Sequence, residues 1–214
     1  LEGLLPHARF VVGDLRDRDL LERLMPGVEL VFHLGALPSV VYSVEHPVES
    51  LSVNFQGTAT LAEVARLNGV RRIVFSSSCA VYGPRASGAL AEDRLPDPAS
   101  PYATAKLASE HLLLNFQHLF GLEAVCLRYF NVFGPRQNPN SEYAAVIPKF
   151  IDRILGGREI RIYGDGEQTR DFVYVGNVAR ANYLACTAPG AAGGVFNIGS
   201  EETYSIKQLA ERLT

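Results

Sequence analysis

The sequence lacks the features that mark secreted, membrane-spanning and nucleic-acid-binding proteins. Its three cysteines, Cys79, Cys126 and Cys186, are too few and too far apart for a disulfide framework or a metal-ligand spacing. No run of about 18 apolar residues is present, so no segment is expected to span a membrane. The net charge is −3 and there is no basic run, which argues against a nucleic-acid surface. Without a signal peptide, the chain is expected to be cytoplasmic, in a reducing compartment, and to hold no metal.

A glycine-rich phosphate-binding loop is also missing. Neither Gly-x-Gly-x-x-Gly nor Gly-x-x-Gly-x-x-Gly occurs, and the nearest candidate, residues 164–166, lies between two expected strands, where a turn explains it better. The chain starts at Leu1 without an initiator methionine and stops at Thr214 within an expected helix. We therefore expect a fragment of a longer protein.

What the sequence does contain is an alternation of short apolar runs with segments of helical periodicity. The runs at 9–12, 30–34, 72–75 and 123–128 predict strands, and the segments 15–25, 48–68 and 101–120 predict helices. The strands are continuous apolar runs, which is typical of a parallel sheet covered on both faces. The sequence thus predicts an α/β fold with a Rossmann-like, doubly wound parallel sheet.

The pattern changes after Asn131. A polar loop is followed by an expected helix at 146–155, strands at 160–163, 170–175 and 195–198, a helix at 177–187 and a last helix capped by Ser205. We predict a first domain over residues 1–133, to which 171–190 return. Residues 134–170 and 191–214 are predicted to form a smaller, partial α/β region.

Polar residues follow four of the predicted strands. They are Asp14, the Gly35-Ala36 turn, the serines of 76–78, and Asn131. In open parallel sheets, ligands bind beyond the carboxyl ends of the strands. Four strand ends that converge on one rim are therefore the first indication of a functional site.

Tyr102 and Lys106 begin the helix predicted at 101–120. Four residues apart, they rise from one helix face, and a neighbouring ammonium lowers the pKa of a phenol from its reference value of roughly 10. Ser78, at the preceding strand end, can pass a proton between a substrate hydroxyl and Tyr102. Spacing alone fits an ordinary amphipathic helix with one exposed lysine better, and serines also end strands without a catalytic role. The polar residues at the four strand ends, together with Arg170 further along the chain, favour instead the interpretation that Ser78, Tyr102 and Lys106 form a proton-transfer site.

Three further residues each allow a plain structural explanation. Arg170 could clamp a diphosphate bidentately or form a surface ion pair with Asp171 or Glu167, and taken alone the ion pair is favoured. His33 lies in an apolar run and is expected to be a core histidine. Cys79 is expected to serve packing.

Together these motifs resemble the extended short-chain dehydrogenase/reductase superfamily, and more narrowly its NAD-dependent sugar-nucleotide epimerases and dehydratases. In that family the glycine loop lies before the point where this chain starts. The matching pieces are Gly13-Asp14-Leu15, Phe32 to Ala36, Asn54 with Gly57-Thr58, Phe75 to Ser78 with Val81-Tyr82-Gly83, Ser100 to Lys106, Arg128 to Asn131 with Gly134-Pro135, and Thr169 to Phe172.

Within this family, two parts of the sequence resemble the 4-epimerases more than the other enzymes: residues 79–80, and the runs 136–140 and 143–148. Dehydratases of the family carry an Asp-Glu pair where this chain has Cys79 and Ala80, and UDP-glucuronate decarboxylases carry a Glu at Ala80. GDP-fucose synthases have a cysteine at the place of Ala80, not of Cys79. The runs 136–140 and 143–148 look like those of UDP-N-acetylglucosamine 4-epimerases.

The resemblance implies a site for NAD and a UDP-sugar. Catalytic roles fall to Ser78, Tyr102 and Lys106. The cofactor is expected to contact Asp14, Leu15, Phe32, His33, Leu34, Gly35, Ala36, Asn54, Ser76, Tyr102, Lys106 and Phe130. The substrate is expected to contact Ser39, Ser78, Tyr102, Asn131, Gln137, Val146, Ile147, Arg161, Tyr163 and Arg170. Residues 1–133 would then be the truncated NAD-binding domain and the smaller region the nucleotide-sugar-binding part.

The implied activity is an NAD-dependent UDP-hexose 4-epimerase that oxidises sugar C4 transiently, with N-acetylated sugars possible as substrates. The alternatives are another nucleotide-sugar-modifying enzyme of the family (a dehydratase, decarboxylase or uronate epimerase) and an NAD-binding relative without catalysis. In relatives, the helices that match 48–68 and 101–120 pair across a homodimer, so a homodimer is expected.

Overall fold

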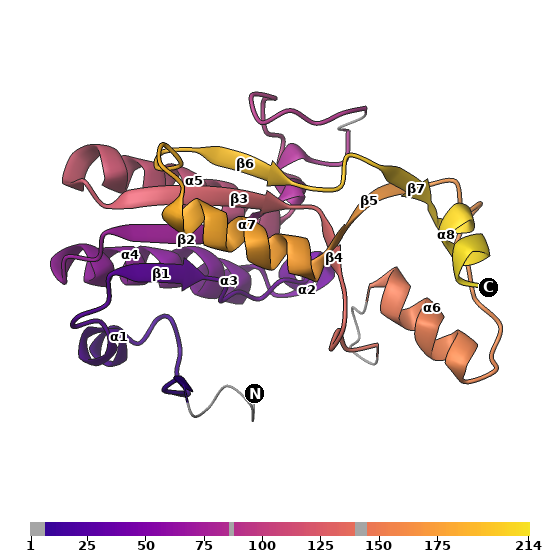
Figure 1. Cartoon of the computed structure of the whole chain (residues 1–214), viewed down its shortest axis with the longest axis horizontal. Helices are drawn as coiled ribbons and strands as arrows, with labels where there is room; N and C mark the ends of the chain where they lie inside the picture. Colours follow the sequence, from indigo (N-terminus) through magenta and orange to yellow (C-terminus); the bar gives the residue numbers. More distant parts are fainter. Residues whose placement is uncertain (1–6, 86–87, 140–144) are drawn as a thin grey trace.

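Four parallel strands form the central sheet of the computed structural model, which describes residues 7–85, 88–139 and 145–214. Their order across the sheet is β1, β2, β3, β6. The bounds are β1 (Leu30–His33), β2 (Arg72–Ser78), β3 (Glu123–Tyr129) and β6 (Val195–Ile198). All four run in the same direction, so their carboxyl ends meet at one edge of the sheet (Figure 1).

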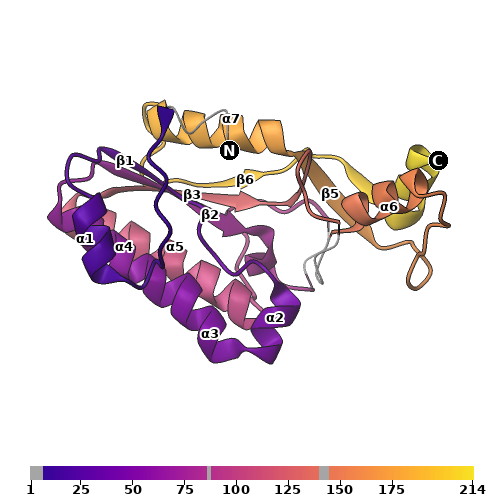
Figure 2. The same cartoon turned by 90° about the horizontal axis from the view of Figure 1, so that it is seen from below.

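Helices cover both faces of this sheet, as Figure 2 shows. One face carries α1 (Arg18–Leu24), α3 (Pro47–Leu51), α4 (Gly57–Leu67) and α5 (Pro101–Phe120), and the other carries α7 (Val175–Thr187). Ile73 and Phe75 of β2 belong to the core under α4 and α5, whereas Val74 belongs to the core under α7. Because successive side chains of a strand point to opposite faces, both faces must be apolar here. The predicted Rossmann-like fold is confirmed.

A second, smaller sheet lies beyond the carboxyl edge of the first (Figure 1). In it β5 (Thr169–Tyr174) pairs in parallel with β4 (Asn131–Phe133) and antiparallel with β7 (Thr203–Ser205). Two amphipathic helices, α6 (Val146–Leu155) and α8 (Ile206–Leu213), bury Ile147, Phe150, Ile206 and Leu209 against one another. A capping box of Ser205 and Gln208 starts α8, as the sequence predicted for Ser205.

The two helices closest to the site differ in how well their sequence predicted them. α5 has the predicted bounds, because Ser100 caps its start and Gly121 ends it with φ 75°. The predicted helix 48–68 is instead three pieces: α3, a π-helical segment over Ser52–Gln56, and α4. The short helix α2 (Val40–Glu45) and the 3₁₀ turn Cys79–Tyr82 were not predicted.

Two predicted strands are wrong. Residues 9–12 form no strand, because they have no hydrogen-bonded partner strand among the described residues; Val12 is 83% exposed. Residues 160–163 are irregular, with Tyr163 82% exposed.

The predicted division of the chain also needs two corrections. Residues 195–198, assigned to the smaller region, are strand β6 of the first sheet. Residues 171–174, assigned to the first domain, lie in β5 of the second sheet, and α7 is the part that returns to the first. Within the described residues, none of the helices is long and apolar enough to cross a bilayer.

Candidate active site

Tyr102 and Lys106 lie in the first two turns of α5 and face β2. Pro101 occupies the first helical position, and both side chains are buried, with 8% and 3% of their surface exposed. The Lys106 ammonium donates to the Ser76 carbonyl at 2.6 Å and lies 5.8 Å from the centre of the Tyr102 ring. The alternative of an amphipathic helix with an exposed lysine is therefore wrong.

The pKa shifts differ from the sequence expectation. Burial raises the pKa of Tyr102 above its ordinary value, and a hydrogen bond with Ser78 opposes that rise. Burial also lowers the pKa of Lys106 to about 8, although the carboxylate of Glu110 opposes this. The prediction that the Tyr102 phenol is acidified by its surroundings is thus wrong for the chain on its own, because desolvation outweighs the more distant ammonium.

Ser78 ends β2 and starts the 3₁₀ turn Cys79–Tyr82. Its hydroxyl oxygen accepts from the Ala80 backbone N–H at 3.2 Å and bonds with Tyr102. The next residue, Cys79, has its pKa raised to about 11 by burial, so its thiol is neutral at physiological pH. The strand end therefore aims one hydroxyl at the tyrosine.

The segment after β1 is fixed by Asn54 of the π-helical segment. The Asn54 side chain accepts from the Leu37 backbone N–H at 2.7 Å and donates to the Leu37 carbonyl at 3.0 Å. Gly35 lies against Leu15, whose Cδ1 would be 2.7 Å from a Cβ at this position. The turn over residues 34–37 is thus held from two sides, and Leu34 and Gly35 are exposed at the carboxyl edge.

Two residues of the expected cofactor site have other partners. The Asp14 carboxylate binds Arg16 at 2.6 and 2.9 Å, which lowers the pKa of Asp14 to about 2. The His33 side chain is 2% exposed and bonds with Thr58 at 2.8 Å, so it is a core histidine, as predicted from the apolar run.

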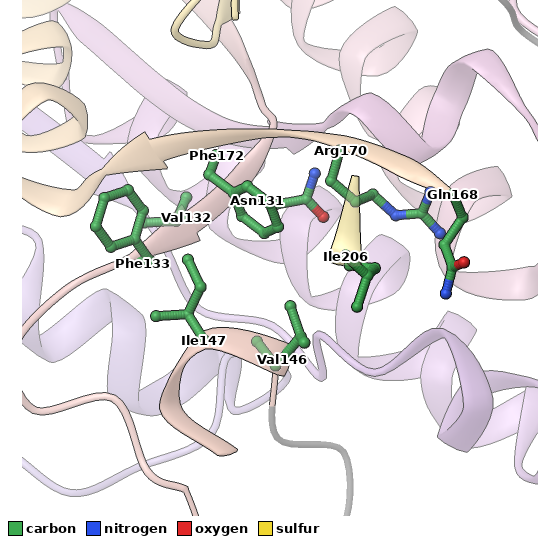
Figure 3. Close-up of a pocket in the computed structure, with 10 residues that line it drawn as sticks. Asn131, Val132, Phe133, Val146, Ile147, Gln168, Arg170, Phe172 and Ile206 are labelled. Atoms are coloured by element: carbon green, nitrogen blue, oxygen red, sulfur yellow. The ribbon is translucent and has the colours of Figure 1, made fainter. Parts of the chain in front are cut away.

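A pocket of about 260 Å³ lies between the second sheet, α6 and α8 (Figure 3). In that view the side chains of Asn131 and Arg170 lie on its strand side, opposite Val146 and Ile147. Four of the predicted substrate residues are thereby brought together. The complete lining is Asn131, Val132, Phe133, Ala145, Val146, Ile147, Gln168, Arg170, Phe172 and Ile206.

Arg170 is not the surface ion pair that its sequence neighbours suggested. Its guanidinium donates to the Thr169 carbonyl at 2.8 Å, while the Asp171 carboxylate accepts from the hydroxyl and backbone N–H of Ser200. Glu167 lies 3.8 Å from Lys207. The exposed Arg170 side chain can therefore bind an anion at the pocket, and the Asn131 amide is fixed beside it by a 2.8 Å bond to the Asp171 carbonyl.

Other predicted substrate and cofactor residues do not line this pocket. Arg161 and Tyr163 are exposed beyond it. Ser39 caps α2, Gln137 donates to the Val132 carbonyl, and the Phe130 backbone donates to Ile198 in β6. Residues 140–144, part of the runs that resembled 4-epimerases, lie outside the described residues.

Sequence reasoning missed six lining residues: Val132, Phe133, Ala145, Gln168, Phe172 and Ile206. Phe172 follows Arg170 by two residues in a strand, so strand periodicity places both side chains on the same face. Ile206 gave no signal, because it reaches the pocket only when α8 packs against α6.

The fold and the site define a Rossmann-like protein with a Ser78, Tyr102 and Lys106 cluster at the end of β2 and the start of α5, and a pocket lined by Asn131 and Arg170 at the second sheet. Residues 2–199 match the NAD dependent epimerase/dehydratase family. A putative UDP-glucose 4-epimerase of Methanocaldococcus jannaschii is 41% identical over 206 residues, which are 95% of this chain and 66% of that protein.

Two solved structures show the same fold. UDP-glucose 4-epimerase of Thermotoga maritima with UDP-glucose has a TM-score of 0.94 and 39% identity, covering 100% of this chain and 69% of that one. UDP-N-acetylglucosamine 4-epimerase of Methanobrevibacter ruminantium, in complex with UDP-N-acetylmuramic acid, has a TM-score of 0.89 and 44% identity, covering 94% and 64%. The chain belongs to the NAD-dependent epimerase/dehydratase family of extended short-chain dehydrogenases/reductases. It spans 66% and 64% of the length of two curated relatives that it matches.

The residues present fit the NAD cofactor of this family. Lys106 uses one of its three ammonium donors on Ser76 in the part of the chain that the structure describes, which leaves donors for ribose hydroxyls. Leu34 and Gly35 are exposed at the same edge, and a glycine there lets a ligand approach the backbone closely.

Proposed function

We propose that the protein to which this chain belongs is an NAD-dependent UDP-hexose 4-epimerase, acting on UDP-glucose and UDP-galactose or their N-acetyl forms. The observation that carries the proposal is the buried Tyr102 phenol, bonded to Ser78 and backed by the Lys106 ammonium at the edge where family members bind NAD. Relatives with 39–44% identity have the same named activity.

In the proposed reaction Tyr102 removes the proton of the sugar 4-hydroxyl, with Ser78 as the relay that orients it. When bound, NAD⁺ would accept the hydride from C4 and give it back to the other face of the 4-keto sugar, and its positive charge would oppose the effect of burial on Tyr102. Lys106 holds the cofactor ribose and adds its own positive charge. After the 4-keto sugar turns over, Tyr102 returns the proton to the oxygen at C4.

The pocket supports a nucleotide diphosphate as the second part of the substrate. Arg170 offers a guanidinium fork for the diphosphate, and Asn131 offers an amide beside it. Val146 and Ile147, at the start of α6, form an apolar wall suited to the uracil. A fixed nucleotide and a loosely held sugar would let the keto sugar present its other face.

Dehydration is disfavoured by the residues beyond Ser78. Cys79 is a neutral thiol, because burial raises its pKa to about 11, and Ala80 has no titratable group. Neither can donate and remove the protons that loss of water from the sugar requires.

The proposal extends to a cytoplasmic homodimer. Apolar side chains on α2 and α3 are exposed, including Val41 at 53%, Val44 at 62% and Val48 at 80%. A second copy of the chain would cover them. The three cysteines are free thiols, which fits a reducing compartment.

The test is Tyr102→Phe in the full-length gene product, incubated with UDP-galactose and with UDP-N-acetylgalactosamine. We expect the wild type to form the 4-epimer and the variant to lose turnover by about 10²-fold or more, since acid–base groups contribute 10²- to 10⁴-fold. Circular dichroism should show an unchanged fold. A variant with wild-type turnover would refute the role of Tyr102, and retained NAD without a 4-epimer in the wild type would favour a binding protein.

A further inference from the structure

Three residues of α5 form a buried stripe along the edge of β2. Tyr102, Lys106 and Glu110 are spaced by four residues, so they lie above one another on one helix face. All three are buried, with 8%, 3% and 2% exposure. The proposed reaction uses the first two and gives no role to Glu110.

Each member of the stripe meets a different serine of β2. Tyr102 bonds with the Ser78 hydroxyl and Lys106 donates to the Ser76 carbonyl. Glu110 accepts from the Ser77 hydroxyl. Three successive contacts therefore fix the helix along the strand that carries Ser78.

Glu110 is held in place by a buried arginine. Arg128 of β3 donates to both carboxylate oxygens, at 3.0 and 2.7 Å, and the two side chains are 6% and 3% exposed. Arg128 also donates to the Tyr82 hydroxyl at 2.9 Å and to the Glu92 carbonyl at 3.2 Å. Because well-packed apolar residues stabilise a core as well as a buried ion pair does, stability alone does not explain this pair.

The surroundings of Lys106 make the charge of Glu110 important. His33 faces it from β1 with its pKa lowered to about 3 by burial, so the imidazole is neutral. From β3, Cys126 is a neutral buried thiol with a raised pKa, and Arg128 adds a positive charge behind Glu110. On α5 itself, Tyr102 is a phenol. Among these groups, Glu110 supplies the negative charge, and it raises the pKa of Lys106 against burial.

We propose that Glu110 is a positioning residue: its carboxylate, fixed by Arg128 and Ser77, keeps Lys106 cationic and seated on the Ser76 carbonyl beside Tyr102. This inference rests on the proposed function for its catalytic consequence. The effect of Glu110 on the pKa of Lys106 follows from the contacts of α5 with β2 and β3, and it can be measured without substrate.

The experiment compares Glu110→Gln with wild type in the full-length gene product. Lys106 is buried whereas Lys149 and Lys207 are exposed, and comparison with Lys106→Arg assigns the Lys106 signal in an NMR titration of labelled lysine side chains. We expect the pKa of Lys106 to fall in Glu110→Gln. In the epimerase assay, kcat should fall at pH 8, by about fivefold for a pKa shift of one unit, and change little at pH 6, with KM nearly unchanged.

Glu123→Gln is the matched control. It makes the same substitution on β3 and removes the partner of another buried arginine, Arg72, at 2.7 Å. The expected result is a loss of stability with the Lys106 titration and the pH profile unchanged. Glu110→Asp, which keeps the charge, should restore the Lys106 titration toward wild type.

An unchanged Lys106 titration in a folded Glu110→Gln would overturn the proposal, as would equal loss of activity at all pH values. If Glu110→Gln does not fold, the double variant Glu110→Gln/Arg128→Met, which removes both charges of the ion pair, carries the test: the pKa of Lys106 should still fall, and no fall would contradict the proposal. Failure of the proposed function would instead appear as a wild type that forms no 4-epimer while the Lys106 titration still shifts as expected.

Discussion

His33 makes the folded protein sensitive to mild acid. Its ring is 2% exposed, lies 5.3 Å from the Phe75 ring, and bonds with Thr58 at 2.8 Å. The Thr58 hydroxyl donates to the Asn54 carbonyl at 2.6 Å, so it accepts from Nε2–H of His33. A second proton on this ring would place a charge in the core next to Lys106, which explains why the pKa of His33 falls to about 3.

The size of the effect follows from linkage between protonation and folding. The pKa of His33 is about 3 in the folded chain and 6.5 in the unfolded one. Between these values the unfolded state binds the extra proton, so stability is lost as pH falls below about 6.5. The loss is about 2 kcal/mol at pH 5 and about 3 kcal/mol at pH 4. Above pH 7 the contribution is constant.

The assay is urea unfolding of wild type and His33→Gln at pH 7 and pH 5, with the free energy of unfolding taken from each curve. Glutamine keeps a donor for Thr58 but cannot take up the proton, so the wild type should lose about 2 kcal/mol more than the variant between the two pH values. His111→Gln, an exposed histidine on α5, should behave like wild type. Equal pH dependence in wild type and His33→Gln would refute the reasoning.

Two further changes test the backbone and the proposed interface. Gly83→Ala should lower the free energy of unfolding by roughly 1–3 kcal/mol or more, because φ is 78° and the new Cβ would lie 2.0 Å from the Asp97 carbonyl oxygen. Gly69→Ala, with φ 73° and open space around the new Cβ, should lower it less. Equal losses in the two variants would count against the contact with Asp97. Val44→Glu should turn a dimer into a monomer in sedimentation experiments without loss of helix content, and a dimer that persists would exclude this face.

The sequence predicted the first sheet well because its signals are local. β2 and β3 are apolar on both faces, and α5 carries its own start and stop signals at Ser100 and Gly121. Strands 9–12 and 160–163 were wrong because an apolar run becomes a strand only when another strand pairs with it. The π-helical segment that aims Asn54 at Leu37 has no comparable pattern in the sequence.

The sequence predicted those site residues that lie in a recognisable motif at or next to the end of a predicted strand. Ser78, Tyr102 and Lys106 meet as expected, and Asn131 and Arg170 share one pocket with Val146 and Ile147. The direction of the Tyr102 pKa shift was not predictable, since desolvation depends on how the neighbouring elements pack. Glu110 was missed because its partners, Ser77 and Arg128, come from two different strands.

Transfer of hydrogen at C4 is the central claim for this protein, and isotopic labelling tests it most directly. UDP-galactose deuterated at C4 is incubated with the full-length gene product in ordinary water, and the epimer is examined by NMR and mass spectrometry. Transient oxidation at C4 predicts UDP-glucose that keeps the deuterium at C4. An epimer that has exchanged this deuterium for solvent hydrogen, or no epimer at all, would contradict the account.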